Sequence, residues 1–571
     1  MRANKTGEGE GRRRMKKFKG IPAAAGLARA TAAVARKAHS GPAEQRTLEE
    51  AVEDCVAQVR LLREKALASV GESGAEIFSA YEALLSDPYL LEPVRRYEKD
   101  GMKTADAVER ALEERAEVFM HASSEYMRQR ADDMRSLKIM LLNALNGGGE
   151  EFDLPKNGEK AVIFAEALTP AQTMSLNNMQ LAGLVTRHGG LTSHVVILAK
   201  ALGIPAVVGF EALDEVGEGV QVLVDGETGE IVCDPDGAAF DAFDRRRAEM
   251  EAFQSKVDRL PPGACVTKDG QTVRVSVNIG SSADLSGLEF RSLHGVGLYR
   301  TEFLFCERET EPSEKEQIEE YRRVFQAVGE HDLVVRTLDI GGDKTIPYLD
   351  LPKEENPFLG CRGIRLCLKR HALLRRQFLA LMKASEGRNF SVMFPMVDTL
   401  GEFRQAKELW KEVRRKAEAE GTNVSGTIRL GIMIETPAAA LCADQFVNEV
   451  DFASIGTNDL TQYVMAADRG NPAVSGLLSH YEPAVIRMIA HVIGVFRKAG
   501  LKISVCGEAG SDVKFLPLLL GMGLRDVSVS RSMADKVRYC IANTSCKSQR
   551  DAEDRVLALE TSKEVRCFLN A

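Results

Sequence analysis

A histidine lies where a glycine-rich loop meets a predicted helix. His194 stands in the segment TRHGGLTSHVVILAKALGIPAVVG, with two glycines and the possible helix caps Thr192 and Ser193 before it. Helix N-termini attract anions, and an imidazole can carry a phosphoryl group as a covalent intermediate. Most loop histidines are simply solvated, so the motif alone makes His194 only a candidate phosphorylation site.

Three arginines lie within or after predicted strands in the second half of the chain. They are Arg300 in LYRTEF, Arg336 in VVRTLDIGGDK, and Arg469 downstream of the strand FASIG. Arginine binds phosphate and carboxylate oxygens through a planar fork of donors. A single arginine could equally form a surface ion pair, but their shared position toward strand ends favours a site for a small polyanion.

Two carboxylates, an amide and a thiol occupy the same kind of position. Glu435 ends RLGIMIE, Asn458 and Asp459 follow FASIG, and Cys506 ends ISVC. Glu435 and Asp459 suit Mg²⁺, which takes one or two carboxylates together with substrate oxygens and water. A cysteine after an apolar strand is usually a small buried hydrophobe, but at a strand end Cys506 could give a proton to an enolate.

Eight predicted strands position these groups. They are VRVSVNI, GVGLY, LVVRTLD, SVMFPMV, RLGIMIE, FASIG, ISVCG and DVSVS, and helical patterns separate most of them. Eight strands alternating with helices over roughly 300 residues predict a (β/α)8 barrel, in which substrate groups collect at the carboxyl ends of the strands. A doubly wound open sheet is the alternative.

The first half of the chain is predicted to hold two further domains. Residues 45–147 show helical spacing and a capping box at Thr47 and Glu50, which indicates an antiparallel helical bundle whose simplest role is scaffold. Short β-rich runs follow, from AVIFAEAL to IVCD, and indicate a compact α/β domain. A charged helical stretch over 237–260, closed by Pro261 and Pro262, predicts a rigid linker.

Composition limits the classes of function. The net charge of -8 argues against nucleic acid as the main partner, because phosphate-binding surfaces need a basic field. No apolar run reaches the length of about 20 residues that a bilayer crossing requires, so we expect a cytoplasmic protein without a membrane partner. The 11 cysteines are scattered without a CxxC pair and are expected to be reduced.

Several of these motifs together resemble one enzyme family. Seven segments are similar to those of Enzyme I of the phosphoenolpyruvate-dependent phosphotransferase system. They are GGLTSHVVILAKALGIPAVVG, LYRTEFLF, VRTLDIGGDK, KEENPFLGCRGIR, MIETPAAA, SIGTNDLTQYVMAADRGN and VCGE. That family phosphorylates itself from phosphoenolpyruvate with Mg²⁺, releases pyruvate, and passes the phosphoryl group to a small phosphocarrier protein, usually called HPr. The resemblance implies the same reaction here, serving sugar uptake or regulation.

The resemblance also implies a role for each candidate residue. His194 is the phosphohistidine, and Cys506 donates the proton to the enolate of pyruvate. Glu435 and Asp459 are metal ligands. The residues expected to bind phosphoenolpyruvate are Arg300, Arg336, Asn458, Asp459 and Arg469.

The implied architecture is multidomain α/β, with a helical bundle inserted in a swivelling phosphohistidine domain and followed by a (β/α)8 barrel. Residues 1–16 form a flexible tail, 17–44 and 148–236 the phosphohistidine domain, and 45–147 the carrier-docking bundle. Residues 237–263 form the helical linker, and 264–571 the phosphoenolpyruvate-binding barrel. The resemblance further implies a homodimer formed through the barrel.

The sequence departs from the family's usual pattern in two places. Beside His194, Arg187 replaces an acidic residue, His188 follows it, and Leu191 replaces a basic one, so Arg187 or His188 would have to help hold the phosphoryl group. In the bundle, Tyr81 stands where a histidine is common.

Two other functions compete with this interpretation. Pyruvate phosphate dikinase and phosphoenolpyruvate synthase share the histidine domain and barrel, but both need an ATP-binding domain, and the first 150 or so residues here lack a glycine-rich nucleotide loop. A non-catalytic regulator that keeps the fold without turnover is the second alternative.

Overall fold

The computed structural model describes residues 15–34, 46–70, 72–120, 125–145, 159–168, 181–188, 194–201, 203–306, 310–341, 346–349, 351–352, 354–424, 427–471 and 473–570. The chain divides into two compact units, and the boundary between them falls at Glu251 and Ala252. The expected tail over residues 1–16 lies almost wholly outside the described residues.

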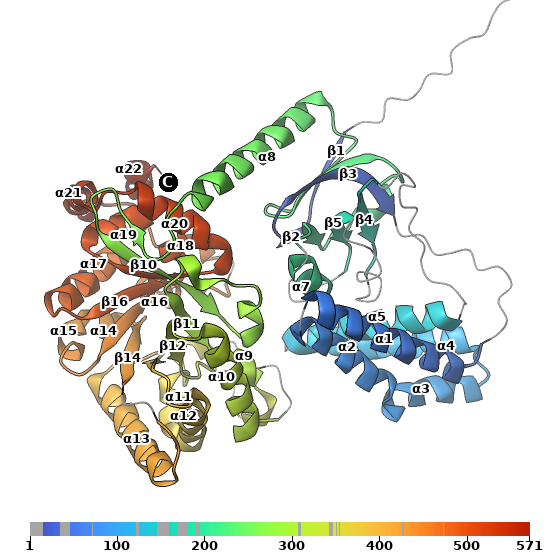
Figure 1. Cartoon of the computed structure of the whole chain (residues 1–571), viewed down its shortest axis with the longest axis horizontal. Helices are drawn as coiled ribbons and strands as arrows, with labels where there is room; N and C mark the ends of the chain where they lie inside the picture. The colour runs from blue at the N-terminus through green and yellow to red at the C-terminus, as the bar shows by residue number, and fades with distance from the viewer. Residues whose placement is uncertain are drawn as a thin grey trace, which may run out of the picture. The chain divides into compact units, whose positions relative to one another are not determined.

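Five helices of the first unit pack as a bundle (Figure 1). They are α1 (Leu48–Val70), α2 (Glu72–Leu85), α3 (Pro88–Lys99), α4 (Thr104–Met120) and α5 (Glu125–Leu145). The predicted capping box begins α1, because the Thr47 amide donates to the Glu50 carboxylate at 2.9 Å and the Glu50 amide donates to Thr47 Oγ1 at 3.2 Å. Apolar side chains from all five helices share one core.

Helix α3 was not predicted from the sequence. The segment Ser86-Asp87-Pro88 reads as a stop, and it does end α2. However, Asp87 also caps the next helix by accepting from the Tyr89 amide at 2.9 Å, and Pro88 occupies the first helical turn. Proline fits there because the first amides of a helix have no partner within it. The same residues therefore stop one helix and start another.

The first unit also contains an eight-stranded sheet. Its strands are β1 (Lys16–Lys19), β2 (Ile21–Ala24), β3 (Leu27–Val34), β4 (Ala161–Ala165), β5 (Leu181–Thr186), β6 (Ala206–Val208), β7 (Gln221–Asp225) and β8 (Glu230–Cys233), in the order β1-β8-β7-β3-β4-β5-β6-β2. The 3₁₀ turn η1 (Leu213–Glu215) precedes β7. Strand β3 pairs in parallel with β4, on the far side of the bundle in sequence, so the bundle is inserted between two neighbouring strands.

Helix α7 (His194–Ala201) covers one face of this sheet. Val196 and Ala199 share a core with Ala24 and Leu184, among others. The helix begins at His194, so the sheet positions the backbone of the candidate phosphorylation site.

Helix α8 (Gly237–Asp258) confirms that the stretch predicted as a linker is helical, and the boundary between the units lies within it. Its first half contacts the sheet: the Arg29 guanidinium lies 4.3 Å from the Phe240 ring centroid and pairs with Asp244 at 2.9 Å. Its last turns belong to the second unit, and within that unit the Phe253 and Tyr539 ring centroids are 5.3 Å apart.

The eight predicted barrel strands are all present in the second unit. They are β10 (Thr272–Ile279), β11 (Gly295–Arg300), β12 (Asp332–Arg336), β13 (Phe390–Phe394), β14 (Ile428–Ile434), β15 (Phe452–Gly456), β16 (Lys502–Cys506) and β17 (Asp526–Val529), with the short β9 (Cys265–Val266) paired antiparallel to β10. Neighbours are parallel, and β10 pairs with both β11 and β17. This closure confirms the barrel and excludes the open sheet.

Helices surround the barrel strands (Figure 1). Those before β15 are α9 (Phe303–Cys306), α10 (Glu314–Val328), α11 (Ile364–Lys369), α12 (His371–Ser385), α13 (Leu400–Ala419), α14 (Pro437–Leu441) and α15 (Ala443–Phe446). Those after it are α16 (Thr457–Met465), α17 (Pro483–Lys498), α18 (Glu508–Ser511), α19 (Leu516–Met522), α20 (Ala534–Asn543), α21 (Cys546–Leu557) and α22 (Ser562–Leu569). Short 3₁₀ turns are η2 (Ser282–Leu285), η3 (Phe290–Ser292), η4 (Pro347–Leu349), η5 (Pro357–Leu359), η6 (Ser475–Leu477) and η7 (Arg531–Met533).

Candidate active site at the carboxyl ends of the barrel strands

The barrel residues predicted from the sequence lie around one rim. Arg300 and Arg336 end β11 and β12 and are register partners, and Cys506 ends β16 opposite Gly456 of β15. Glu435 follows the last residue of β14, and Asn458 and Asp459 lie in the first turn of α16, directly after β15. Parallel strands in a closed barrel place these ends on the same face.

Arg336 is buried and bound by carboxylates. Its Nη2 donates to Glu302 Oε1 at 2.7 Å, and its Nη1 lies 3.5 Å from Asp339 Oδ2. Glu302 Oε1 also accepts from the Asp339 amide at 3.0 Å, so Glu302 connects the start of α9 to the segment after β12. Arg336 is thereby held in place by side chains of the barrel itself.

A second buried arginine completes the cluster. Arg362 donates from Nη2 to Asp339 at 2.9 Å and from Nη1 to Asp459 at 3.2 Å. Sequence reasoning did not single out Arg362, Asp339 or Glu302. Each of them lies in one of the quoted motifs: Arg362 in KEENPFLGCRGIR, Asp339 in VRTLDIGGDK and Glu302 in LYRTEFLF. A charged residue beside apolar ones in these motifs is the signal that could have identified all three.

Arg469 reaches the same cluster from the loop after α16. Its Nη1 lies 3.5 Å from Asp459 Oδ1, and its guanidinium lies 4.9 Å from the Phe358 ring centroid. The Tyr463 hydroxyl, which accepts from Arg362 Nη1 at 3.3 Å, donates to the Phe358 carbonyl. Tyr463 therefore ties the segment containing Phe358 to the buried arginine.

Asn458 is engaged by the loop after β16. Its Oδ1 accepts from the Glu508 amide at 3.1 Å. Gly507 lies between Cys506 and that amide with φ of +99°, and a Cβ there would come within 2.9 Å of Asn458 Oδ1. Only glycine allows this close approach in that backbone conformation. Asn458 and Cys506 are thus held by one short turn.

Glu435 is 1% exposed, and its Oε1 accepts from the Met396 amide at 2.7 Å. Burial and the nearby carboxylates of Asp459 and Asp339 raise the pKa of Glu435, although Arg336 and Arg362 oppose this. The excess of buried negative charge is the environment that a divalent cation would relieve.

The donor set fits Mg²⁺. Glu435 and Asp459 supply hard carboxylate oxygens, and a Cβ at Gly456 would lie 2.8 Å from Glu435 Oε2, so glycine keeps that oxygen clear. Among the described residues no three His, Cys, Asp or Glu side chains form a ligand group. Two carboxylates completed by substrate oxygens and water are what Mg²⁺ usually takes.

Cys506 is 3% exposed, and its sulfur accepts from Ser454 Oγ at 3.4 Å. Burial raises the pKa of Cys506 to about 11, while Ser454 and the charges of Arg336 and Arg300 partly oppose the shift. At neutral pH the thiol therefore keeps its proton and can act as an acid.

The loop before His194, residues 189–193 with Leu191, lies outside the described residues, as does the His194 side chain. The Arg187 guanidinium pairs with Glu166 and Asp214 and donates to the Glu211 carbonyl at 3.2 Å. Both of its Nη groups are therefore engaged by the domain itself. His188 Nε2 lies 3.5 Å from Glu166.

Tyr81, the departure in the bundle, is a core residue. Its side chain is 1% exposed, and its hydroxyl donates to the buried Asp133 carboxylate at 3.3 Å. A phenol in this position satisfies a buried carboxylate rather than facing a partner.

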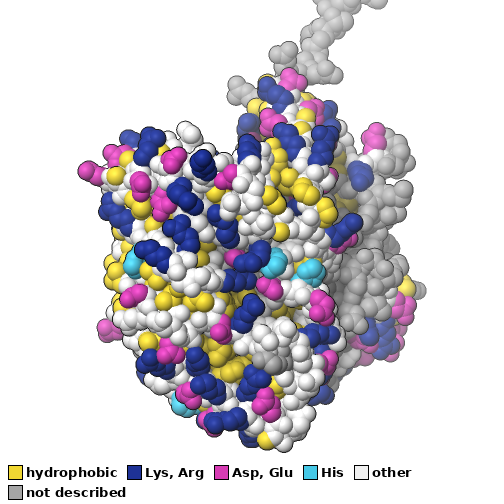
Figure 2. Space-filling model, turned by 60° about the vertical axis from the view of Figure 1, so that its left-hand side comes forward, with side chains coloured by type: hydrophobic (Ala, Val, Ile, Leu, Met, Phe, Trp, Pro, Cys, Tyr) yellow, Lys and Arg dark blue, Asp and Glu magenta, His cyan; other side chains and the backbone are white. Residues whose placement is uncertain are grey.

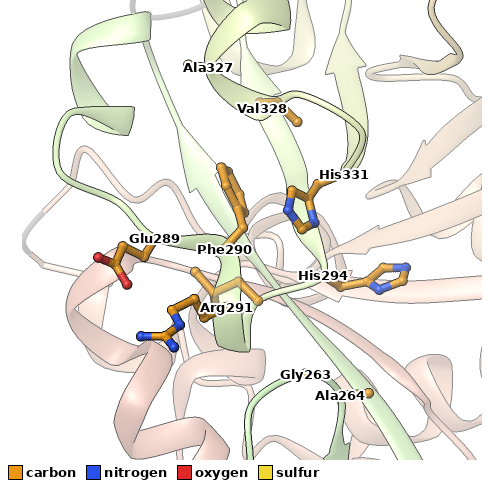
Figure 3. A pocket seen from close by; sticks show the side chains of 10 residues that line it. Gly263, Ala264, Glu289, Phe290, Arg291, His294, Ala327, Val328 and His331 are labelled. Carbon is orange, nitrogen blue, oxygen red and sulfur yellow. The ribbon is translucent and has the colours of Figure 1, made fainter.

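A cavity lies at the opposite end of the barrel, and Figure 3 shows it. It measures about 870 Å³ and is lined by residues before β11 and β12, including Phe290, His294 and His331. The Phe290 and His331 rings stack with centroids 4.8 Å apart. Because active sites of such barrels form at the carboxyl ends of the strands, this cavity is not the candidate site.

On the face seen in Figure 2, Lys and Arg side chains are interspersed with Asp and Glu. None of the helices in the described part of the chain is long and apolar enough to cross a membrane.

Comparisons with known proteins cover most of the chain. Residues 19–130, 157–229 and 254–546 match the families described as PEP-utilising enzyme, N-terminal, mobile domain and PEP-binding domain, respectively. Phosphoenolpyruvate-protein phosphotransferase of Priestia megaterium is 40% identical over 97% of this chain and 99% of its own length. The Bacillus subtilis protein of that name is also 40% identical, over 97% and 99%.

A third relative, from Listeria monocytogenes, carries the same name and is 41% identical over 91% of both chains. Similarity at this level along nearly the whole length covers the barrel, the sheet and the bundle together. The chain therefore belongs to the phosphoenolpyruvate-protein phosphotransferase family and is an enzyme of that type.

Proposed function

We propose that the protein phosphorylates His194 from phosphoenolpyruvate, releases pyruvate, and passes the phosphoryl group to a histidine of a small HPr-type carrier protein. The observation that carries the proposal is the ring of arginines and carboxylates at one end of the barrel, in a chain similar to phosphoenolpyruvate-protein phosphotransferases along its whole length. Whether the relay serves sugar uptake or regulation depends on the carrier.

The arginines would bind the trianionic substrate. Arg336 and Arg362 are buried among four buried carboxylates, and Arg300 and Arg469 are more exposed at the rim. Phosphoryl transfer depends mainly on positioning and on neutralising the charge of the transferred group. The more exposed pair supports binding of the incoming anion, and the buried pair supports its orientation.

Glu435 and Asp459 would hold Mg²⁺, together with oxygens of the substrate. When bound, the ion would balance the excess buried carboxylate charge and neutralise charge on the phosphoryl group. Asn458, held by the turn after Cys506, would add an amide donor to the substrate.

Cys506 would protonate the enolate left when the phosphoryl group departs. Its thiol is the acid form at neutral pH and lies at the end of β16, beside the substrate-binding rim. Its place on the rim and its protonation state support this role.

His194 would be the nucleophile, presented at the first residue of α7 on the α/β domain. Because the barrel supplies the substrate site, we infer that the α/β domain delivers the histidine first to the barrel and then to the carrier. The bundle would dock the carrier, and we further propose a homodimer through the barrel and a cytoplasmic location. Sedimentation of the full chain tests the dimer.

Incubation of the full chain with phosphoenolpyruvate and Mg²⁺ tests the central proposal. We expect an acid-labile phosphohistidine that mass spectrometry places at His194, and transfer to an added HPr-type carrier. His194→Ala should abolish the label while phosphoenolpyruvate binding persists. A correctly folded chain that takes no label would make the protein a non-catalytic member of the family. Labelling by ATP with inorganic phosphate would instead favour dikinase chemistry.

A further inference from the structure

Ser454 contacts the sulfur of Cys506 from the neighbouring strand. Its Oγ donates to Sγ across 3.4 Å, and the thiol lies 3.6 Å from the carbonyl oxygen of Ile455. Ser454 is 1% exposed, and Cys506 is 3% exposed. The register of β15 and β16 pairs Ser454 with Ser504 and Gly456 with Cys506, so both side chains project to the same side of the barrel wall.

The sulfur lies in an apolar layer of the barrel. The layer is formed by Leu298, Val334, Met393, Met433 and Phe452 together with Cys506. An ionised thiolate in such surroundings has lost the hydrogen bonds of water and is costly unless a donor replaces them. The hydroxyl of Ser454 is a donor in direct contact with it.

We propose that Ser454 is a positioning residue for Cys506: its hydroxyl orients the thiol at the strand end and donates to the thiolate that remains after proton transfer. The inference rests on the proposed function, in which Cys506 protonates the enolate of pyruvate. Ser454 does not touch the substrate and acts only through the sulfur.

The proton-transfer step balances without a redox partner. The methylene carbon of the enolate forms a C–H bond, the S–H bond of Cys506 breaks, and its electron pair stays on sulfur. Water later returns a proton to the thiolate. Between these two events Ser454 supplies a charge-assisted hydrogen bond, which is stronger than the bond to the neutral thiol. Ser454 therefore favours the state that follows transfer.

Two measurements on the full chain separate this role from phosphoryl transfer. Single-turnover labelling of His194 reports the phosphoryl step. Exchange of labelled pyruvate into phosphoenolpyruvate at equilibrium also requires the methyl proton to move through Cys506. We expect Ser454→Ala to slow pyruvate exchange roughly 10- to 100-fold, because the hydrogen bond to the charged thiolate is lost. The rate of His194 labelling should fall by no more than about threefold.

Ser504→Ala is the matched control. Ser504 is on the same strand as Cys506, and its hydroxyl donates to the Ala453 carbonyl at 3.5 Å. Both rates should stay at the wild-type level. Ser454→Thr retains a hydroxyl, so it should restore most of the exchange, and the melting temperature of each variant reports any structural damage.

Each result has a defined meaning. Wild-type exchange in Ser454→Ala overturns the inference, and so does an equal loss of both rates in a variant that melts normally. If Ser454→Ala melts lower, a Ser454→Thr variant with wild-type stability but slow exchange overturns it as well. A wild-type chain that takes no label overturns the proposed function, and the inference falls with it.

Discussion

At the scale of single residues, Arg336 and Arg362 are each paired with carboxylates of the barrel. Glu302, Asp339 and Asp459 bind their guanidinium groups at distances between 2.7 and 3.5 Å. The carboxylates fix the orientation of each guanidinium group. A substrate would therefore bind to arginines that are already oriented. The cost of reorganising the site during reaction is thereby reduced.

Arg336→Lys tests the importance of the planar fork. The substitution keeps the charge but cannot bind two partners in one plane, so we expect His194 labelling by phosphoenolpyruvate to slow by roughly 100- to 1000-fold. The rate is measured in a single turnover at subsaturating phosphoenolpyruvate.

Arg274→Lys provides a control for that substitution. Arg274 makes two bonds of 2.6 Å to Asp526, near the amino ends of β10 and β17 and away from the rim. The rate of His194 labelling in Arg274→Lys should remain at the wild-type level. Equal losses in both variants would show that the fork of Arg336 has no special role.

At the scale of elements, Asp512 joins the loop before α17 to the end of α18. Its Oδ2 lies 3.1 Å from His480 Nε2 and accepts from the Tyr481 hydroxyl at 2.5 Å, while Oδ1 accepts from the Lys514 amide at 2.9 Å. Burial alone would raise the pKa of Asp512, but the hydrogen bonds from His480 and Tyr481 outweigh it and hold the pKa below its ordinary value.

The lowered pKa of Asp512 means that its ionised carboxylate stabilises the folded state. A carboxylate with a lowered folded-state pKa stabilises the fold above its unfolded pKa of about 4, and the contribution is lost as the pH falls below that value. Asp512→Asn should therefore reduce the free energy of unfolding by about 1–3 kcal/mol at pH 7 and by less near pH 3. Urea unfolding at both pH values measures the difference.

Asp551→Asn is the comparison for Asp512→Asn, because Asp551 is exposed on α21 of the same unit. It should change the free energy of unfolding by less than about 0.5 kcal/mol at either pH. If the difference in free energy of unfolding between Asp512→Asn and wild type is the same at both pH values, the predicted pH dependence is wrong.

At the scale of the whole molecule, the two compact units have separate cores. The barrel core and the cores of the bundle and sheet share no residue. All the proposed substrate contacts lie after residue 252, and His194 lies before it. Binding and covalent capture of the phosphoryl group are thus assigned to different units.

Calorimetry tests this division. We expect two unfolding transitions in the His194→Ala chain. Phosphoenolpyruvate with Mg²⁺ should raise the midpoint temperature of the barrel's transition and leave the other unchanged. At about 100 times the dissociation constant, the ligand should add about 2.7 kcal/mol and raise the midpoint by several degrees. Adding Arg336→Lys should abolish the shift. A shift confined to the first unit would place the substrate elsewhere.

The sequence by itself determined the elements and most of the rim. Alternating and apolar patterns are local, so all eight barrel strands and the linker helix could be predicted, and the rule that barrels collect substrate groups at strand ends then brought Arg300, Arg336, Glu435 and Cys506 together. Helix α3 was missed because Pro88 both breaks one helix and begins another.

Only the tertiary structure decided which side chains touch. Arg362 and Asp459 are 97 residues apart, and Ser454 and Cys506 are 52 apart, yet each pair is in contact. Such contacts depend on the register between strands and on barrel closure, which no local pattern encodes. The ion pairs that orient the arginines, and the hydroxyl beside the thiol, therefore emerge only when the strands are assembled.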